Sequence, residues 1–117
     1  MKIKNEKTGK IEDIRLPKEF KNKWVKALRS GDYSQGKLRL ENSCGDMCCL
    51  GVACRIVHPK LILKEFAYIN DSVAKKTTKV PGILKGINSI IPEKLTKMND
   101  SGKHSFKSIA SYIERYL

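Results

Sequence analysis

The sequence of 117 residues predicts one small α+β domain that is dominated by helices, with a central buried helix and a small antiparallel sheet. Three observations predict this class. Apolar residues recur at helical spacing in residues 17–29 and 105–117, an almost continuous apolar run covers residues 47–57, and short stretches of alternating polarity lie between these segments. The chain is long enough for one hydrophobic core and too short for two. We therefore expect a single globular domain over residues 17–117, preceded by a basic extension over residues 1–16.

The first expected element is an amphipathic helix of residues 17–29. Phe20, Trp24 and Leu28 share one face of this helix, and Ser30-Gly31 supplies its end. Because Trp24 lies on the apolar face, burial in the core is the simpler interpretation of this side chain. Stacking of its indole ring on a ligand is the alternative.

A segment rich in turn-forming residues comes next, and it leads into the central helix. Leu38 and Leu40 alternate with charged residues, which predicts a short, half-buried strand. Asp46 is the expected N-cap of a helix over residues 47–57, which ends before Pro59. Its apolar residues cover nearly the whole circumference, so we expect this helix to be enclosed on most sides.

The second half of the chain alternates between short elements and one longer helix. Residues 61–70 alternate well enough to predict a strand, and residues 72–79 read as a polar connection. Two short helical pieces are expected to open at Pro81 and at Pro92. Ser105 is the expected N-cap of the last helix, which carries its apolar residues on one face.

The composition is strongly basic. The chain has 24 Lys and Arg against 12 Asp and Glu, a formal charge of +12, and residues 1–30 hold ten of the basic and four of the acidic side chains. Such a charge favours an anionic partner: a nucleotide-like ligand, nucleic acid or an acidic protein. No apolar run is long enough to cross a membrane, and none follows the basic start as a secretory signal would require. We therefore expect a cytoplasmic protein with reduced thiols and no membrane partner.

All four cysteines, Cys44, Cys48, Cys49 and Cys54, fall within eleven positions. A structural zinc site usually takes two spaced pairs of ligands from separate segments, and adjacent cysteines on a helix point about 100° apart. A disulfide framework is disfavoured by the expected reducing compartment. We therefore predict neither a metal site nor a cofactor. Packing of small, polarisable side chains in the core is the favoured interpretation.

A cysteine nucleophile is the alternative interpretation. Cys48 or Cys49 would lie in the first turn of the central helix, where the positive end of the helix dipole stabilises a thiolate. Gln35 could then donate to an oxyanion, with His104 or Asn99 as a partner of the cysteine. This pattern would make the protein a cysteine-dependent hydrolase or transferase.

A second candidate site lies in residues 98–106. Asn99 and Asp100 are residues that form turns and helix caps, and a tight connection between two helices explains them. They could instead offer an amide and a carboxylate to a ligand, beside the free N–H groups at the start of the last helix. A helix-turn-helix is disfavoured because this connection is longer than the usual turn.

Four segments together resemble a known family: KWVKALRSGDYSQG, CCLGVACRI, VPGIL and KLTKMNDSGKHSFKSIASYIERYL. They are similar to a family of small, mostly uncharacterised bacteriophage and prophage proteins that share a Cys-Cys-Leu-Gly-Val motif and a Met-Asn-Asp-x-Gly-x-Ser-Phe motif. The basic leader, Cys44 and an inserted His104 depart from the pattern, which weakens His104 as a catalytic base. The resemblance covers residues 23–117 and picks out Trp24, Leu28, Tyr33, Gln35, Cys48, Cys49, Gly51, Asn99, Asp100, Gly102, Ser105 and Phe106.

The resemblance implies a small phage-type accessory protein that acts by binding rather than by turnover, in the cytoplasm of the bacterial host. We expect it to bind an anionic partner and to interfere with a host process, with antiviral defence as the leading candidate. For a nucleotide-like ligand, Tyr33 or Trp24 would stack on the base, while Gln35, Asn99 and Asp100 would bind polar groups.

Two alternatives stay open. One is the cysteine-dependent hydrolase or transferase that uses Cys48 or Cys49. The other is a non-specific nucleic-acid-binding protein that uses the basic amino-terminal stretch.

Overall fold

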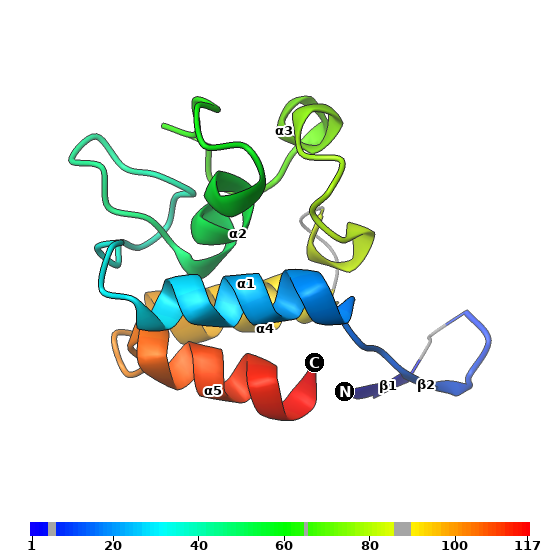
Figure 1. The fold of residues 1–117 in the computed structure, drawn as a ribbon. Coiled ribbons are helices and arrows are strands. Elements are labelled where there is room, and N and C mark those ends of the chain that lie inside the picture. Colours follow the sequence, from blue (N-terminus) through cyan, green and yellow to red (C-terminus); the bar gives the residue numbers. More distant parts are fainter. Residues whose placement is uncertain (5–6, 65, 86–89) are drawn as a thin grey trace.

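Four helices form the body of the protein. The computed structural model describes residues 1–4, 7–64, 66–85 and 90–117. Helices α1 (Lys18–Arg29) and α4 (Ile90–Asp100) lie roughly parallel, with α2 (Cys49–Val57) above them and α5 (Phe106–Tyr116) below them in the view of Figure 1. Helix α2 contacts both α1 and α4, and α5 contacts both from the other side. Within the described residues, no helix is both long and apolar enough to cross a membrane.

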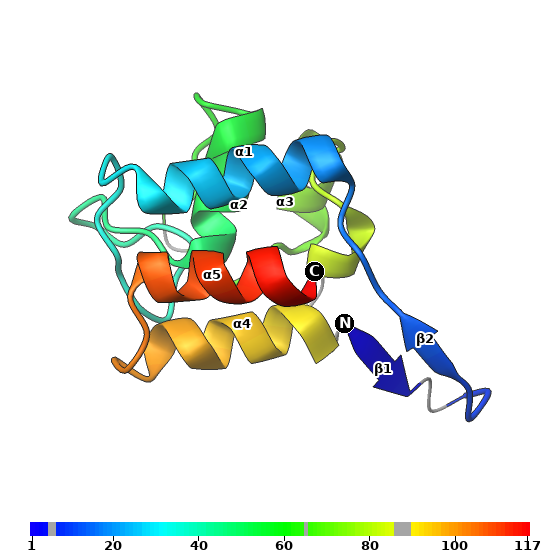
Figure 2. The same cartoon turned by 60° about the horizontal axis from the view of Figure 1, so that its bottom comes forward.

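The sheet is a short hairpin at the start of the chain. Strands β1 (Lys2–Lys4) and β2 (Ile11–Asp13) pair antiparallel, and the hairpin projects from the helical body (Figures 1 and 2). The prediction of a small, helix-dominated α+β domain with an antiparallel sheet is therefore confirmed. The predicted position of the strands is wrong. In the described part of the chain, the segments near Leu40 and Leu63 contribute isolated bridges, from Glu41 to Met47 and to Lys64.

Helix α2 begins two residues later than predicted, and Asp46 does not cap it. Met47 is held in an extended conformation, because its N–H donates to the Ser34 carbonyl at 2.8 Å and its carbonyl accepts from Gly36 at 2.7 Å. Asp46 is held in a turn with Asn42, whose side-chain oxygen accepts the Asp46 N–H at 3.0 Å. Cys48 is the N-cap residue instead, and its side chain makes no capping hydrogen bond.

The predicted polar connection over residues 72–79 contains a helix, α3 (Asp71–Lys76). The Asn70 side chain accepts the Val73 N–H at 3.0 Å and so caps this helix. An acidic residue in the first turn and lysines in the last turn also suit the helix dipole. The sequence therefore contains a helix cap and charges that suit a helix, but the helix was missed because it is only six residues long.

The predicted last helix is confirmed, since the Ser105 hydroxyl accepts the Ser108 N–H at 3.2 Å at the start of α5. The piece predicted after Pro81 is a short 3₁₀ helix, η1 (Gly82–Leu84). Helix α4 already includes Ile90 and Ile91, so Pro92 lies inside its first turn rather than opening it. The rest of the first predicted piece, residues 86–89, lies outside the described residues.

The core surrounds α2, as predicted for a central buried helix. Its residues Cys49 to Cys54 are all buried. Gly51 is needed for this packing, because a Cβ at this position would lie 2.0 Å from the carbonyl oxygen of Leu40. The glycine of the Cys-Cys-Leu-Gly-Val motif thus lets the backbone of residue 40 lie directly against the helix.

Candidate functional site

Several of the predicted site residues meet in a buried polar network where α2 begins and α4 ends. Asn99 lies at its centre and is 1% exposed. Its side-chain oxygen accepts from the backbone N–H of Cys49 and from the Gln35 amide, each at 3.2 Å. Its amide nitrogen donates to the Gly36 carbonyl at 2.7 Å. Both polar atoms of Asn99 are therefore used by the protein itself.

Gln35 and Asp100 extend this network on either side. The Gln35 amide also donates to the His104 carbonyl at 2.9 Å, which fixes the loop before α5. One Asp100 carboxylate oxygen accepts from the Leu38 N–H at 3.0 Å and from the Asn99 amide at 3.1 Å. The network therefore joins the loop after α1, the start of α2 and the end of α4, and its first role is to hold these segments together.

The two aromatic residues predicted to stack on a ligand differ in burial: Trp24 is fully buried and Tyr33 is half-buried. Trp24 has no exposed surface, packs against Phe20 with ring centroids 5.7 Å apart, and donates from its indole N–H to the Cys49 carbonyl at 2.9 Å. The prediction that its ring stacks on a ligand is wrong, because neither face is accessible. Tyr33 is half-buried where it packs against the core.

The cysteines of the motif are buried and protonated. Burial raises the pKa of the Cys48 thiol to about 11, although the nearby backbone N–H groups of Gly51 and Leu50 act in the opposite direction. Burial also raises the pKa of Cys49 well above its usual value, and this thiol donates to the Leu95 carbonyl at 3.8 Å. At neutral pH only about one Cys48 thiol in 10⁴ would be ionised. This disfavours either residue as a nucleophile.

The other two cysteines, Cys44 and Cys54, do not form a disulfide. Cys44 is exposed, Cys54 is buried, and all four thiols are free. Over residues 1–4, 7–64, 66–85 and 90–117, no three His, Cys, Asp or Glu side chains come together in a way that could hold a metal ion.

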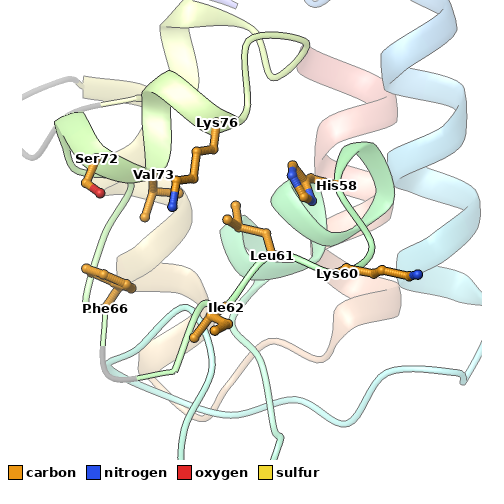
Figure 3. Close-up of a pocket in the computed structure, with 8 residues that line it drawn as sticks. All are labelled: His58, Lys60, Leu61, Ile62, Phe66, Ser72, Val73 and Lys76. Carbon is orange, nitrogen blue, oxygen red and sulfur yellow. The ribbon is translucent and has the colours of Figure 1, made fainter.

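An open cavity of about 630 Å³ lies on another part of the molecule, between the end of α2, the chain that follows it and α3 (Figure 3). Leu61 and Val73 are buried in its wall, whereas the Ile62 side chain is 76% exposed at its edge. The lining residues are His58, Lys60, Leu61, Ile62, Phe66, Ser72, Val73 and Lys76.

The polar groups around this cavity are basic or neutral. Lys76 extends from α3 with its ammonium group toward the apolar side chains, whereas Lys60 points away from them (Figure 3). His58 adds an imidazole at the end of α2, and Ser72 adds a hydroxyl. None of the described lining side chains is acidic. The cavity therefore offers an apolar surface beside cationic donors.

None of the described residues that line this cavity is among the site residues predicted from the sequence. The available signal was a helix that ends at His58-Pro59-Lys60, followed by the large apolar residues Ile62 and Phe66 outside a regular element. The strand predicted over residues 61–70 places both side chains on one face of a sheet, where they would be buried rather than line a cavity.

A family model described as a domain of unknown function, DUF8296, matches residues 16–80, more than half of the chain. The chain belongs to this family. The DUF8296 match contains α1, α2, α3 and all eight of the described residues that line the cavity, whereas Asn99 and Asp100 lie beyond it. No curated protein and no solved structure matches the chain.

Proposed function

We propose that this DUF8296 chain is a binding protein whose larger cavity takes an anionic, nucleotide-like ligand. One observation carries the proposal: the ammonium group of Lys76 points toward the apolar side chains of a cavity of about 630 Å³, and no described acidic side chain lines it. Small-molecule sites usually have volumes of about 300–1,000 Å³ and combine an apolar lining with a few polar groups. The cavity has both properties.

Each part of such a ligand has a counterpart in the lining. A flat base would cover Phe66, Ile62 and Leu61, gaining about 25 cal/mol for each Å² of apolar surface removed from water. A phosphate would accept charge-assisted hydrogen bonds from the Lys76 ammonium group. A base alone would lack this second interaction, so the charged group should contribute much of the affinity.

The wider role is part of the same proposal. The resemblance to small phage and prophage proteins supports an accessory protein that acts in the host cytoplasm. By binding an anionic ligand, it would withdraw that ligand from a host process, for which antiviral defence is the leading candidate. The net charge of +12 supports fast association with such partners.

Titration of the ¹⁵N-labelled full chain tests the proposal, with adenosine 5′-monophosphate as the probe and adenosine and inorganic phosphate as references. We expect saturable shifts at the amides of residues 58–62 and 72–76, with adenosine and phosphate each binding at least tenfold more weakly. Lys76→Gln should weaken nucleotide binding at least fivefold. Lys75→Gln is the matched control, because Lys75 is exposed on the same helix but does not line the cavity.

Three results would overturn the proposal. The first is the absence of saturable binding by any of a panel of nucleoside mono- and diphosphates. The second is equal loss of affinity in the Lys76→Gln and Lys75→Gln variants, which would indicate general charge attraction. The third is a set of shifts centred on the amino-terminal hairpin, which would favour the nucleic-acid-binding alternative.

A further inference from the structure

A second cavity, of about 320 Å³, lies against α4 and has the opposite charge character. Its apolar surface comes from the loop after α1, from α2 and from the chain before α3. One polar side runs along α4, from Glu93 in its first turn to Asp100 at its end. The lining residues are Leu38, Leu50, Ala67, Tyr68, Pro92, Glu93, Thr96, Lys97 and Asp100.

Asp100 supplies the negative charge of this cavity. The Glu93 carboxylate, which also lines it, pairs with Lys97 one helical turn away at 3.1 Å, so these two charges largely cancel. No described cation pairs with Asp100. Its carboxylate is nevertheless fixed in place, because one oxygen accepts hydrogen bonds from Leu38 and Asn99. In a chain with twice as many cations as anions, this carboxylate is oriented by hydrogen bonds without an ion-pair partner among the described residues.

Two large side chains that line the same cavity are exposed. Leu38 is 72% exposed, and its backbone has a φ of +68°, a conformation that is costly for any residue other than glycine. The hydrogen bond from its N–H to Asp100 holds it there. Tyr68 is also exposed at this cavity. Exposed apolar groups around a concave, charged site are typical of a surface that binds another protein.

We propose that this cavity binds an arginine side chain of a partner protein. The guanidinium group would pair with Asp100 and stack on the Tyr68 ring, while Leu38 and Leu50 would cover the aliphatic stem. Charge complementarity requires a cation, and the aromatic wall favours a planar guanidinium over the compact ammonium of lysine. The cavity has about half the volume of the first one, which suits one side chain. The proposal is independent of the anionic-ligand site.

Titration of the ¹⁵N-labelled full chain with Nα-acetyl-arginine methylamide tests this proposal. We expect saturable shifts at the amides of Leu38, Thr96 and Asp100. The corresponding citrulline probe has nearly the same shape without the charge, and it should bind at least fivefold more weakly. The corresponding lysine probe should bind at least threefold more weakly than arginine.

Variants identify the group responsible. Asp100→Asn keeps an oxygen that can accept from Leu38 but removes the charge, so it should lower arginine affinity at least fivefold. Asp71→Asn is the matched control, because Asp71 is an exposed carboxylate that does not line this cavity. It removes the same charge from another place on the surface and should change the affinity less than twofold.

A second variant keeps the test valid if Asp100→Asn fails to fold. Leu38→Gly suits the positive φ and removes one wall, so it should fold and should lower arginine affinity at least threefold. Equal affinity for arginine and citrulline, stronger binding of lysine, or shifts away from these amides would overturn the proposal. Unchanged affinity in both Asp100→Asn and Leu38→Gly would also overturn it.

Discussion

The backbone N–H of Cys49 donates to the side-chain oxygen of Asn99 at 3.2 Å, which joins the start of α2 to the end of α4. The two motifs that the sequence analysis singled out are therefore parts of one structural unit, although the two residues are fifty positions apart in the chain. An N–H group at the first turn of a helix has no partner within the helix. Asn99 supplies that partner from the other side of the core.

Replacing Asn99 by alanine should destabilise the fold strongly. The change leaves the Cys49 N–H and the Gly36 carbonyl without their partner in a buried region. An unsatisfied buried group costs about 1–3 kcal/mol, so we expect the free energy of unfolding to fall by about 3 kcal/mol. Urea denaturation followed by circular dichroism measures it. Asn22→Ala, at an exposed position of α1, should not lower the stability, and a loss below about 1 kcal/mol for Asn99→Ala would contradict the assigned role.

The buried thiol of Cys48 should make the stability depend on pH in the alkaline range. Its pKa is raised to about 11 in the folded protein, so the folded state holds this proton more tightly than the unfolded state does. The contribution is fully present below the unfolded pKa of about 8.5–9 and is lost as the pH rises toward 11, at about 1.4 kcal/mol per pH unit. Cys49 and Cys54 shift in the same direction.

A comparison of two variants isolates this effect from the titration of lysines and tyrosines. The stability difference between the wild-type protein and Cys48→Ala should be constant from pH 6 to 8 and should shrink above pH 9. Cys44→Ser, at an exposed thiol, should follow the wild-type pH profile. Iodoacetamide at pH 7.5 should label Cys44 first, and rapid labelling of Cys48 in the folded protein would contradict this account.

The long helices could be predicted because each carries its own local signals. The face of α1 with Trp24, the cap of α5 at Ser105 and the apolar run of α2 are all readable from neighbouring residues. The strand predicted around Leu38 and Leu40 failed for a different reason. Leu40 is buried, but Leu38 is turned outward by a left-handed backbone, so the alternation does not come from a strand.

The environment of the candidate sites depended on contacts that no local pattern encodes. Asn99 was selected as a ligand-binding or turn residue, and the structure uses it as a partner of Cys49 across the core. The larger cavity forms where α3 packs beside the chain after α2, and its prediction required both the missed helix and the position of that helix. Hence the motifs indicated the residues of the buried polar network, while the larger cavity and the role of each network residue depend on tertiary contacts.

Replacing Gly51 by alanine should prevent normal folding. The added Cβ would lie 2.0 Å from the carbonyl oxygen of Leu40, far inside van der Waals contact, and backbone on both sides would have to move. We expect a loss of at least about 3 kcal/mol, a value beyond the usual range for overpacking. Gly82→Ala is the control, since a Cβ there meets nothing within 4 Å. Similar melting temperatures for the two variants would show that α2 does not pack on residue 40 in this way.

Replacing Leu38 by glycine should stabilise the protein. The residue has a φ of +68°, which costs about 1–2 kcal/mol for a residue with a side chain. Its side chain buries little surface in return, because it is 72% exposed. We therefore expect a gain of about 1 kcal/mol, reduced slightly by the greater freedom of glycine in the unfolded chain. Leu38→Ala retains the strain and should not give this gain in a urea titration.

The half-buried ion pair of Arg55 and Glu41 should matter more than the exposed pairs of the surface. Arg55 donates to the Glu41 carboxylate at 2.9 Å and to the Pro59 carbonyl at 2.7 Å, and the two side chains are 21% and 14% exposed. Arg55→Ala leaves the Glu41 carboxylate poorly hydrated and without its cation. It also removes the hydrogen bond to the Pro59 carbonyl, in the segment that leads to the larger cavity. We expect a loss of about 2 kcal/mol, since breaking one side of a buried pair is costly.

The exposed pair of Arg29 and Glu114, joined at 2.8 Å, supplies the control for this prediction. Arg29→Ala should leave the free energy of unfolding almost unchanged, because water solvates both partners and salt screens their attraction. The double variant Arg55→Ala with Glu41→Gln should recover part of the loss, since the isolated carboxylate is then removed. Equal effects of Arg55→Ala and Arg29→Ala, or no recovery in the double variant, would show that burial does not strengthen the Arg55–Glu41 interaction.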